Sequence, residues 1–257
     1  MKSLFLQGSK SLLLNSLLMI TFSQLAEAQS ASNKEGYSLS NPSSTRVDNK
    51  IGDKIPGLLR AVELDPKSAD NLTKLGVAYI EARSYTQALA SLQSAIALNP
   101  GYAYAYNALG NVFYKLERLD ESIRAYDKAI SLRSDLASAH AGRGQVLYRT
   151  DRSAEAIESL HKAIELEPAD AITLNDLGCA YLGIGEYELA LSQFREALLH
   201  SPGLSIARRN LSIAYLYSGN RDAAIREYGQ LGKTDAKLAE TLARILFGDL
   251  IIKATSH

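Results

Sequence analysis

No disulfide bond can form within this chain, because Cys179 is the only cysteine among its 257 residues. Tryptophan is absent, and the 28 basic residues are balanced by 28 acidic ones. A surface that binds nucleic-acid phosphates normally carries an excess or a block of basic residues, so this balance predicts no nucleic-acid binding. Because no disulfide bond can contribute, stability must come from the packing of apolar side chains.

Long apolar runs are also lacking, since the apolar N-terminal run Ser11–Phe22 is shorter than the roughly 20 residues that a membrane-spanning helix needs. Lys2 and Lys10 precede the run, and small residues in an A-x-A pattern follow it, ending at Ala28. This arrangement is typical of a secretory signal peptide. We predict a signal peptide over residues 1–28, cleaved after Ala28; an uncleaved membrane anchor is the alternative.

The exported chain that this cleavage would produce is almost neutral. Removing Lys2, Lys10 and Glu27 leaves 26 basic and 27 acidic residues out of 28 of each. No cysteine closely follows the apolar run, so a lipid anchor has no acceptor there, and we expect no stable membrane insertion after cleavage. Residues 29–50 are rich in serine and asparagine and predict a flexible polar leader, because they bury too little apolar surface to offset the entropy of ordering.

Small residues recur in the rest of the chain at a fixed spacing of about 34 residues. At such positions the backbones of two helices can approach closely. The first set is Gly76, Gly110, Gly144, Gly178 and Ser212. The second set is Ala88, Ser122, Ala156, Ala190 and Ala224, and the third is Ala95, Ala129, Ala163 and Ala197, with Leu231 in the last place.

Large residues and prolines follow the same period. The large residues are Tyr79, Phe113, Leu147, Tyr181 and Tyr215 in one set, and Leu92, Tyr126, Leu160, Phe194 and Tyr228 in another. Pro66, Pro100, Pro168 and Pro202 recur, with Ser134 in the remaining place. Because proline lacks an N–H group and clashes with the preceding turn, these positions predict the ends of helices.

These columns in common register resemble the tetratricopeptide repeat family. The resemblance implies an all-α, right-handed superhelical solenoid of antiparallel helix pairs. Five units would cover residues 69–102, 103–136, 137–170, 171–204 and 205–238. A leading half repeat would cover residues 51–68, and a capping helix with a tail would cover residues 239–257, because a solenoid needs a cover over its last apolar face.

The third unit departs from the pattern at His140 and Arg143, where neighbouring units carry tyrosine or leucine. A guanidinium group at such a position must reach water or find a partner, because a buried unpaired charge is costly. We therefore expect the third unit to be the least stable one.

Catalytic and metal-binding patterns are missing. His140, His161, His200 and His257 show no metal-ligand spacing, and no nucleotide-binding or nucleophile motif occurs. Cys179 is interpreted as a small apolar residue or as a thiol facing the groove. We predict a protein that is not an enzyme and has no cofactor and no metal site.

The family resemblance implies that first-helix residues line a concave groove that binds a partner peptide. The carried-over positions are Tyr104, Asn107, Asn111, Tyr114, Lys115, Gln145, Tyr148, Arg149, Asn175, Cys179 and Leu182. Amides can bond an extended backbone, and tyrosines are enriched at binding hot spots. The clamp by which chaperone-binding members hold a carboxylate is missing, because its places hold Thr73, Val77, Ala108, Ser138 and Gly142.

We therefore predict an exported, non-catalytic scaffold or adaptor, in the periplasm or outside the cell, that binds a protein or peptide segment. Cell-envelope assembly, secretion and pilus construction are the pathways that the compartment and the family suggest. A self-assembling homo-oligomer is the alternative. A regulatory subunit of an enzyme has the least support.

Overall fold

The computed structural model describes residues 44–254, with side-chain exposure for residues 54–247. The predicted signal peptide, most of the predicted leader and the last three residues lie outside the described residues. The chain divides into a unit of residues 1–53 and a unit of residues 54–257, and the repeats belong to the second. None of the helices in the described part is both long and apolar enough to span a bilayer.

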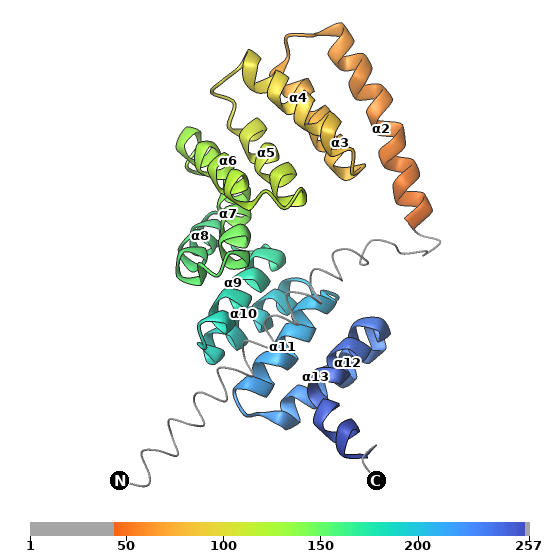
Figure 1. Cartoon of the computed structure of the whole chain (residues 1–257), viewed down its shortest axis with the longest axis vertical. Helices are drawn as coiled ribbons and strands as arrows, with labels where there is room; N and C mark the ends of the chain where they lie inside the picture. The colour runs from red at the N-terminus through yellow and green to blue at the C-terminus, as the bar shows by residue number, and fades with distance from the viewer. Residues whose placement is uncertain (1–43, 255–257) are drawn as a thin grey trace. The chain divides into compact units, whose positions relative to one another are not determined.

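The described residues form twelve α-helices and no strand (Figure 1). The first helices of the five repeats are α3 (Ala69–Glu81), α5 (Ala103–Lys115), α7 (Ala137–Arg149), α9 (Ala171–Gly183) and α11 (Ser205–Tyr217). The second helices are α4 (Tyr85–Leu98), α6 (Leu119–Leu132), α8 (Ser153–Leu166), α10 (Tyr187–His200) and α12 (Arg221–Thr234). Helix α2 (Ser44–Leu64) precedes them and α13 (Ala236–Ala254) follows.

One helix precedes the five repeats and another follows them. Helix α2 begins at Ser44, within the range predicted to be a leader, and Val62 near its end packs against the buried cluster that contains Leu72 of α3. Helix α13 contacts both α11 and α12, and its Leu242 is fully buried. The last repeat is therefore covered by α13, a helix that belongs to no complete pair.

The contacts between helices define a curved stack. Each helix from α3 to α13 packs against the next one along the chain. The first helix of each repeat also contacts the first helix of the following repeat, whereas the described second helices make no such contact with one another. The stack therefore bends toward the first helices. This arrangement confirms the predicted all-α solenoid of helix pairs.

Glycines allow the two helices of a repeat to pack closely. A Cβ atom at Gly76 would lie 2.7 Å from Cγ of Leu92, and one at Gly178 would lie 2.6 Å from Cε1 of Phe194. In the fifth repeat Ser212 is fully buried, and its hydroxyl donates a hydrogen bond to the carbonyl of Ala224 at 2.7 Å. The first set of small residues and the set of large residues that includes Leu92 and Phe194 thus face each other across the interface between the two helices of a repeat.

The second helices end at the same register whether or not a proline follows. Helices α4, α8 and α10 end two residues before a proline, and α6 ends at Leu132, two residues before Ser134. The residue between has a similar φ in each case, from −134° at Glu167 to −149° at Arg133. Packing of the next helix therefore fixes this turn, and proline is not required for it.

The turn inside each repeat contains one residue with left-handed backbone. These residues are Arg83, Glu117, Asp151, Gly185 and Gly219, one in each repeat at the same register, with φ between 56° and 84°. Left-handed backbone favours glycine, because a Cβ atom there approaches the neighbouring carbonyl group. Glycine occupies the position in the fourth and fifth repeats only.

We expect Gly219→Ala to lower the free energy of unfolding by about 1–2 kcal/mol. The φ of Gly219 is 84° and nothing lies within 4 Å of an added Cβ atom, so the loss comes from backbone strain alone. Gly229→Ala is the matched control, because this site in α12 is equally open but helical, and the change should stabilise by about 0.5–1 kcal/mol. Denaturant unfolding measures both. Equal effects of the two changes would contradict the assignment of strain.

The unusual residues of the third repeat have partners. Arg143 is part-buried, and its Nε lies 2.6 Å from Oδ1 of Asp127. The ring Nε2 of His140 lies 2.9 Å from the carbonyl oxygen of Ser134. Arg143 therefore resolves the expected conflict by pairing with a carboxylate of the preceding helix.

Candidate functional site

The inner face of the solenoid is the side on which α3, α5, α7, α9 and α11 contact one another. All eleven predicted groove residues belong to the first helices α5, α7 and α9, and Tyr104 lies in the first turn of α5. Tyr104 is 41% exposed, and the Arg133 guanidinium lies 5.0 Å from its ring centroid. The phenol of Tyr104 also accepts a hydrogen bond from Arg133.

An aromatic-basic cluster, Tyr114, Lys115, Tyr148 and Arg149, lies at the ends of α5 and α7. The Arg149 guanidinium carbon is 4.9 Å, and the Lys115 Nζ 5.5 Å, from the centroid of the Tyr114 ring. Both distances fall within the range of cation–π attraction. Burial raises the pKa of Tyr114, while the nearby Arg149 lowers it, so the phenol is a neutral hydrogen-bonding group.

Arg149 has an exposed partner. Its Nη2 lies 2.5 Å from Oε2 of Glu117, whose side chain is 66% exposed. Such a solvent-exposed ion pair contributes about 0–1 kcal/mol. A ligand carboxylate could therefore exchange with Glu117 at little cost.

The amide side chains of the inner face are partly used within the protein. Nδ2 of Asn107 donates to Oγ of Ser138 at 3.2 Å, and Oδ1 of Asn107 is buried without a hydrogen-bond partner. Oδ1 of Asn111 accepts from the hydroxyl of Tyr126 at 2.6 Å. Nε2 of Gln145 donates to Asp176 at 3.3 Å. Each amide keeps further hydrogen-bonding capacity, because an amide has two donors and two acceptor positions.

A cleft of about 330 Å³ opens between α5, α7 and the start of α9. It exists because the third repeat carries Ala141 and Gly142 where the fourth carries Asn175 and Asp176. Its polar lining includes Asn111, Ser138, Gln145, Asp170, Thr173 and Asp176. The cleft thus joins two of the predicted groove amides to side chains that the sequence analysis did not select.

The predicted groove residues of α9 are less accessible to a ligand than those of α5 and α7 that line the cleft. Asn175 is 4% and Cys179 is 8% exposed, and Leu182 packs on the core around Phe194. Burial raises the pKa of Cys179 to about 12, so its thiol is protonated and unreactive at neutral pH. Of the two interpretations of Cys179, the structure supports the small buried residue.

Sequence reasoning missed a polar network beneath this part of the inner face. Nδ2 of Asn210 donates to Oδ1 of Asn175 at 2.9 Å and contacts Sγ of Cys179 at 3.2 Å. Oδ1 of Asn210 accepts from Nε and Nη2 of Arg209, at 3.2 and 3.1 Å. Arg209 and Asn210 are 5% and 4% exposed. They lie in the fifth repeat at positions where Asn175 and Asp176 stand in the fourth, so the repeat register could have found them.

Burial raises the pKa of Asp176 to about 7, and hydrogen bonds from Asn175 and Gln145 lower it only in part. The folded state therefore binds a proton more tightly than the unfolded state, whose aspartate pKa is about 3.9. Ionisation of Asp176 opposes folding, and this loss of stability grows as pH rises from about 4 to about 7.

We expect Asp176→Asn to become progressively more favourable to folding, relative to the natural chain, between pH 5 and pH 8. Asparagine carries no charge at either pH, so it avoids the cost of ionising a buried carboxyl group. Denaturant unfolding at pH 5, 6, 7 and 8 measures the difference. A difference that is constant with pH would show that Asp176 ionises as freely in the folded state as in the unfolded one.

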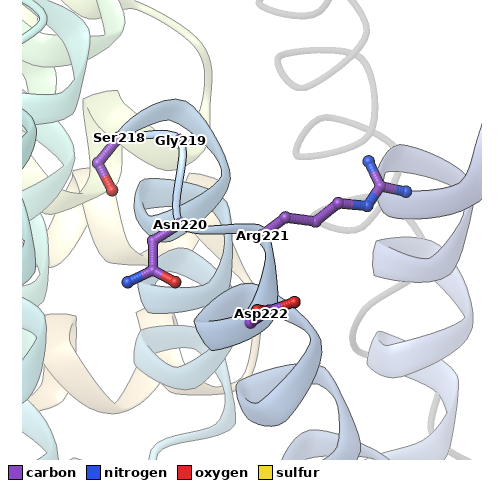
Figure 2. A pocket seen from close by; sticks show the side chains of 5 residues that line it. All are labelled: Ser218, Gly219, Asn220, Arg221 and Asp222. Atoms are coloured by element: carbon purple, nitrogen blue, oxygen red, sulfur yellow. The ribbon is translucent and has the colours of Figure 1, made fainter.

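A second pocket, of about 360 Å³, lies at the turn between α11 and α12. Figure 2 shows its five lining residues, Ser218 to Asp222, which are consecutive in the chain, with the Arg221 side chain extending away from the turn. Arg221 donates to the carbonyl oxygen of Leu246 in α13 at 2.9 Å. This pocket brings together no side chains from separate repeats, so its residues serve the turn and the docking of α13.

Histidines elsewhere in the described part of the chain make contacts with single neighbouring side chains. Within the described part of the chain no three histidine, cysteine, aspartate or glutamate side chains are grouped so that they could hold a metal ion. His161 bonds the Tyr181 hydroxyl at 2.7 Å, and His200 lies 3.2 Å from Glu196. The first contact joins α8 to α9, and the second lies within α10.

Solved structures with the same fold have low sequence identity to this chain. YrrB, described as a TPR protein with an unusual peptide-binding site, is 24% identical, with a TM-score of 0.59 over 73% of this chain and 97% of YrrB. PilW, described as a widely conserved type IV pilus biogenesis factor, is 21% identical, with a TM-score of 0.66 over 71% of this chain and 86% of PilW. Pseudomonas aeruginosa PilF is 21% identical, with a TM-score of 0.63 over 73% of this chain and 86% of PilF.

Family models identify the repeats directly. Models described as TPR repeat or tetratricopeptide repeat match residues 83–117, 110–151, 137–170 and 175–237. No curated protein sequence matches the chain significantly. The models together span more than half of the 257 residues, and they fall within the stack of helices from α3 to α13. The chain belongs to the tetratricopeptide repeat family.

Proposed function

We propose that this protein is a non-catalytic scaffold that binds a segment of a partner protein on its inner face. The observation that carries the proposal is the aromatic-basic cluster beside the cleft. There Arg149 and Lys115 flank the ring of Tyr114 at 4.9 and 5.5 Å. Tyrosine and arginine are among the residue types that most often dominate binding energy at protein interfaces.

The aromatic-basic cluster and the cleft suit different parts of a bound segment. The cluster offers rigid aromatic surface and positive charge, so it favours an acidic or aromatic side chain. Asn111 and Gln145 in the cleft lining can exchange hydrogen bonds with an extended backbone. The proposed contact therefore runs across α5 and α7, with Tyr104 at its edge.

Export and pathway belong to the proposal as well. The N-terminal pattern ending at Ala28 supports secretion into the periplasm or beyond the cell. The fold similarity to PilW, a type IV pilus biogenesis factor, is in accord with a role in cell-envelope assembly or secretion.

Co-purification tests the groove assignment. The test variant combines Tyr114→Leu, Lys115→Ala, Tyr148→Phe and Arg149→Ala, which remove the binding groups but keep apolar packing. The control combines Arg124→Ala and Lys128→Ala, two exposed changes on α6. Partners recovered with the natural chain should be lost with the test variant and kept with the control, and melting curves should show that both variants fold. Unchanged partners with the test variant would refute the assignment.

Self-assembly is the second candidate, favoured by exposed leucines at the ends of α2, α4 and α6. Leu64, Leu98 and Leu132 recur at the same register of successive repeats and are 80%, 45% and 36% exposed. Exposed apolar side chains in a row can form an interface between copies. Light scattering over a concentration series separates the candidates, because a groove-binding monomer keeps its mass whereas an assembling protein gains mass with concentration.

A further inference from the structure

The cleft between α5, α7 and the start of α9 has no basic side chain in its lining. Its charged lining residues are Glu167, Asp170 and Asp176, all of them acidic. None of these three carboxyl groups forms an ion pair with another described residue. The cleft therefore carries negative charge that the described part of the chain leaves without a counter-charge.

Asp176 is the part-buried carboxyl group of the three, and its partners are neutral. It accepts hydrogen bonds from the amides of Asn175 and Gln145, both at 3.3 Å. Burial raises the pKa of Asp176 to about 7, and the negative charge of Asp170 contributes to the rise. Because a carboxylate removed from water is normally paired with a cation, ionised Asp176 lacks a positive partner.

The other two carboxyl groups have unused hydrogen-bonding capacity. Oδ2 of Asp170 accepts from the backbone N–H of Thr173 at 3.0 Å at the start of α9, whereas its Oδ1 accepts no hydrogen bond from the described residues. The side chain of Glu167 is exposed and has no hydrogen-bond or ion-pair partner among them. Both groups can therefore accept hydrogen bonds from a ligand without losing a contact that holds the fold.

A buried acceptor beside the cleft also lacks a donor. Oδ1 of Asn107 is fully buried and has no hydrogen-bond partner, while Nδ2 of the same amide donates to Oγ of Ser138 in the cleft lining at 3.2 Å. It is the one side-chain atom of this kind among the described residues, and such an atom is destabilising. This observation involves no carboxyl group, and it too indicates that a donor is missing on this side of the cleft.

The acidic lining is specific to one junction between repeats. The equivalent positions one period earlier are Arg133, Leu136 and Gly142, and those one period later are Ser201, Leu204 and Asn210. The neighbouring repeats therefore pack in the same way without any of the three carboxyl groups. Because the fold does not require these groups at this register, their presence together at the cleft calls for a ligand.

The shape of the cleft favours an organic cation over a metal ion. Within the described residues, no three histidine, cysteine, aspartate or glutamate side chains are close enough together to hold one metal ion. The cleft also has an apolar side, formed by Ala137, Ala141, Ala163 and Ile172. Lysine and arginine side chains have an apolar stem and a charged head, so they can contact the apolar side and the carboxyl groups at once.

We propose that the cleft binds a lysine or arginine side chain of the partner segment, with Asp176, Asp170 and Glu167 as the acceptors for its charged head. The inference rests on the proposed function and adds the kind of residue that the cleft selects. Ammonium and guanidinium groups donate several charge-assisted hydrogen bonds, which are the donors that the cleft lacks. This chemistry is the opposite of the carboxylate clamp of chaperone-binding relatives, because the cleft repels a carboxylate.

The test uses the full chain, labelled with ¹³C and ¹⁵N, and follows side-chain carboxyl signals by NMR at pH 8. The probes are N-acetyllysine amide and N-acetylarginine amide, N-acetylnorleucine amide, which has an apolar stem without a charge, and calcium chloride. The Asp176 signal is assigned by its loss in Asp176→Asn. Glu155→Gln is the matched control, because it removes a carboxylate of α8 that pairs with Arg152 at 2.6 Å and does not line the cleft.

We expect a saturable shift of the Asp176 signal with the lysine or the arginine probe, and none with the norleucine probe. Binding, followed by backbone amides of α7 and α9, should weaken at least tenfold in Asp176→Asn and stay within twofold in Glu155→Gln. No shift at Asp176, equal shifts with charged and neutral probes, or an equal shift with calcium would overturn the proposal.

The asparagine variant also separates a binding role from a structural one. Asp176→Asn should be at least as stable as the natural chain at pH 8, because asparagine avoids the cost of a buried charge, so weaker binding could not result from unfolding. Ala141→Leu is a second variant, which keeps all three carboxyl groups and fills the apolar side of the cleft. It should also weaken binding at least tenfold. Unchanged binding in this variant would show that the cation lies outside the cleft.

The titration and the co-purification test can fail separately, because the titration requires no partner protein. Loss of partners on changing the aromatic-basic cluster, without a shift at Asp176, would refute the cation site alone. A shift at Asp176, with partners unaffected by the cluster changes, would refute the cluster assignment alone.

Discussion

Phe194→Ala is expected to lower the free energy of unfolding by about 3–5 kcal/mol. Phe194 is fully buried in α10, and its ring packs in a cluster with Leu191 and Leu211. These residues come from two successive repeats, so the cavity would weaken the packing within the fourth repeat and between it and the fifth. Denaturant unfolding of the variant measures the loss. A loss below about 1 kcal/mol, typical of a surface change, would contradict this role.

The same site permits a sharper test through its glycine partner. A Cβ atom at Gly178 would lie 2.6 Å from Cε1 of Phe194, so Gly178→Ala alone should cost about 1–3 kcal/mol through overpacking. In the Phe194→Ala background the clash is gone, and alanine is favoured over glycine in a helix by about 1 kcal/mol. The second substitution should then be neutral or stabilising. Additive effects in this double-mutant cycle would contradict direct contact between the two columns.

The fold could be predicted from the sequence because its determinants repeat. Each glycine of the first set faces a large residue sixteen positions later in the chain, so one strict period fixes both helices and their interface. Individual repeats could depart from the pattern without loss of register. Ser134 replaces a proline, yet α6 still ends at Leu132, because α7 must begin where it can pack on α6.

The inner face was less predictable, because its chemistry depends on how closely successive repeats approach. Register placed Asn175 and Cys179 among the groove residues, but contact between α9 and α11 buries both. The same approach brings Asn210 and Arg209 into a network with them. A one-dimensional pattern identifies the face on which a residue lies, but it does not give the distance to the next repeat.

Deleting one whole repeat is also expected to lower the free energy of unfolding strongly. Deleting residues 137–170 takes away α7 and α8 as one period and joins Leu136 to Ala171, where the next first helix begins. One interface between repeats is lost, and the stability of a solenoid depends on such interfaces. A loss of about 4 kcal/mol, similar to that of one large buried side chain, corresponds to a fall in Tm of about 8–16 °C.

The deletion also creates a defined clash. Tyr126 of α6 packs against Gly142 of α7, where a Cβ atom would lie 2.5 Å from the tyrosine ring. In the shortened chain Asp176 takes the place of Gly142 and brings a carboxyl group against that ring. Adding Asp176→Gly to the deletion should therefore restore part of the lost stability. No recovery would show that α6 and α9 do not pack in the register that the repeats predict.

The most direct test of the central claim, that helix pairs are stable only through their neighbours, is the thermal unfolding of the chain lacking residues 137–170, followed by circular dichroism at 222 nm. We predict a single cooperative transition at a temperature at least about 8 °C below that of the full chain. A transition at an unchanged temperature would mean that each repeat is stable by itself, and would contradict the account.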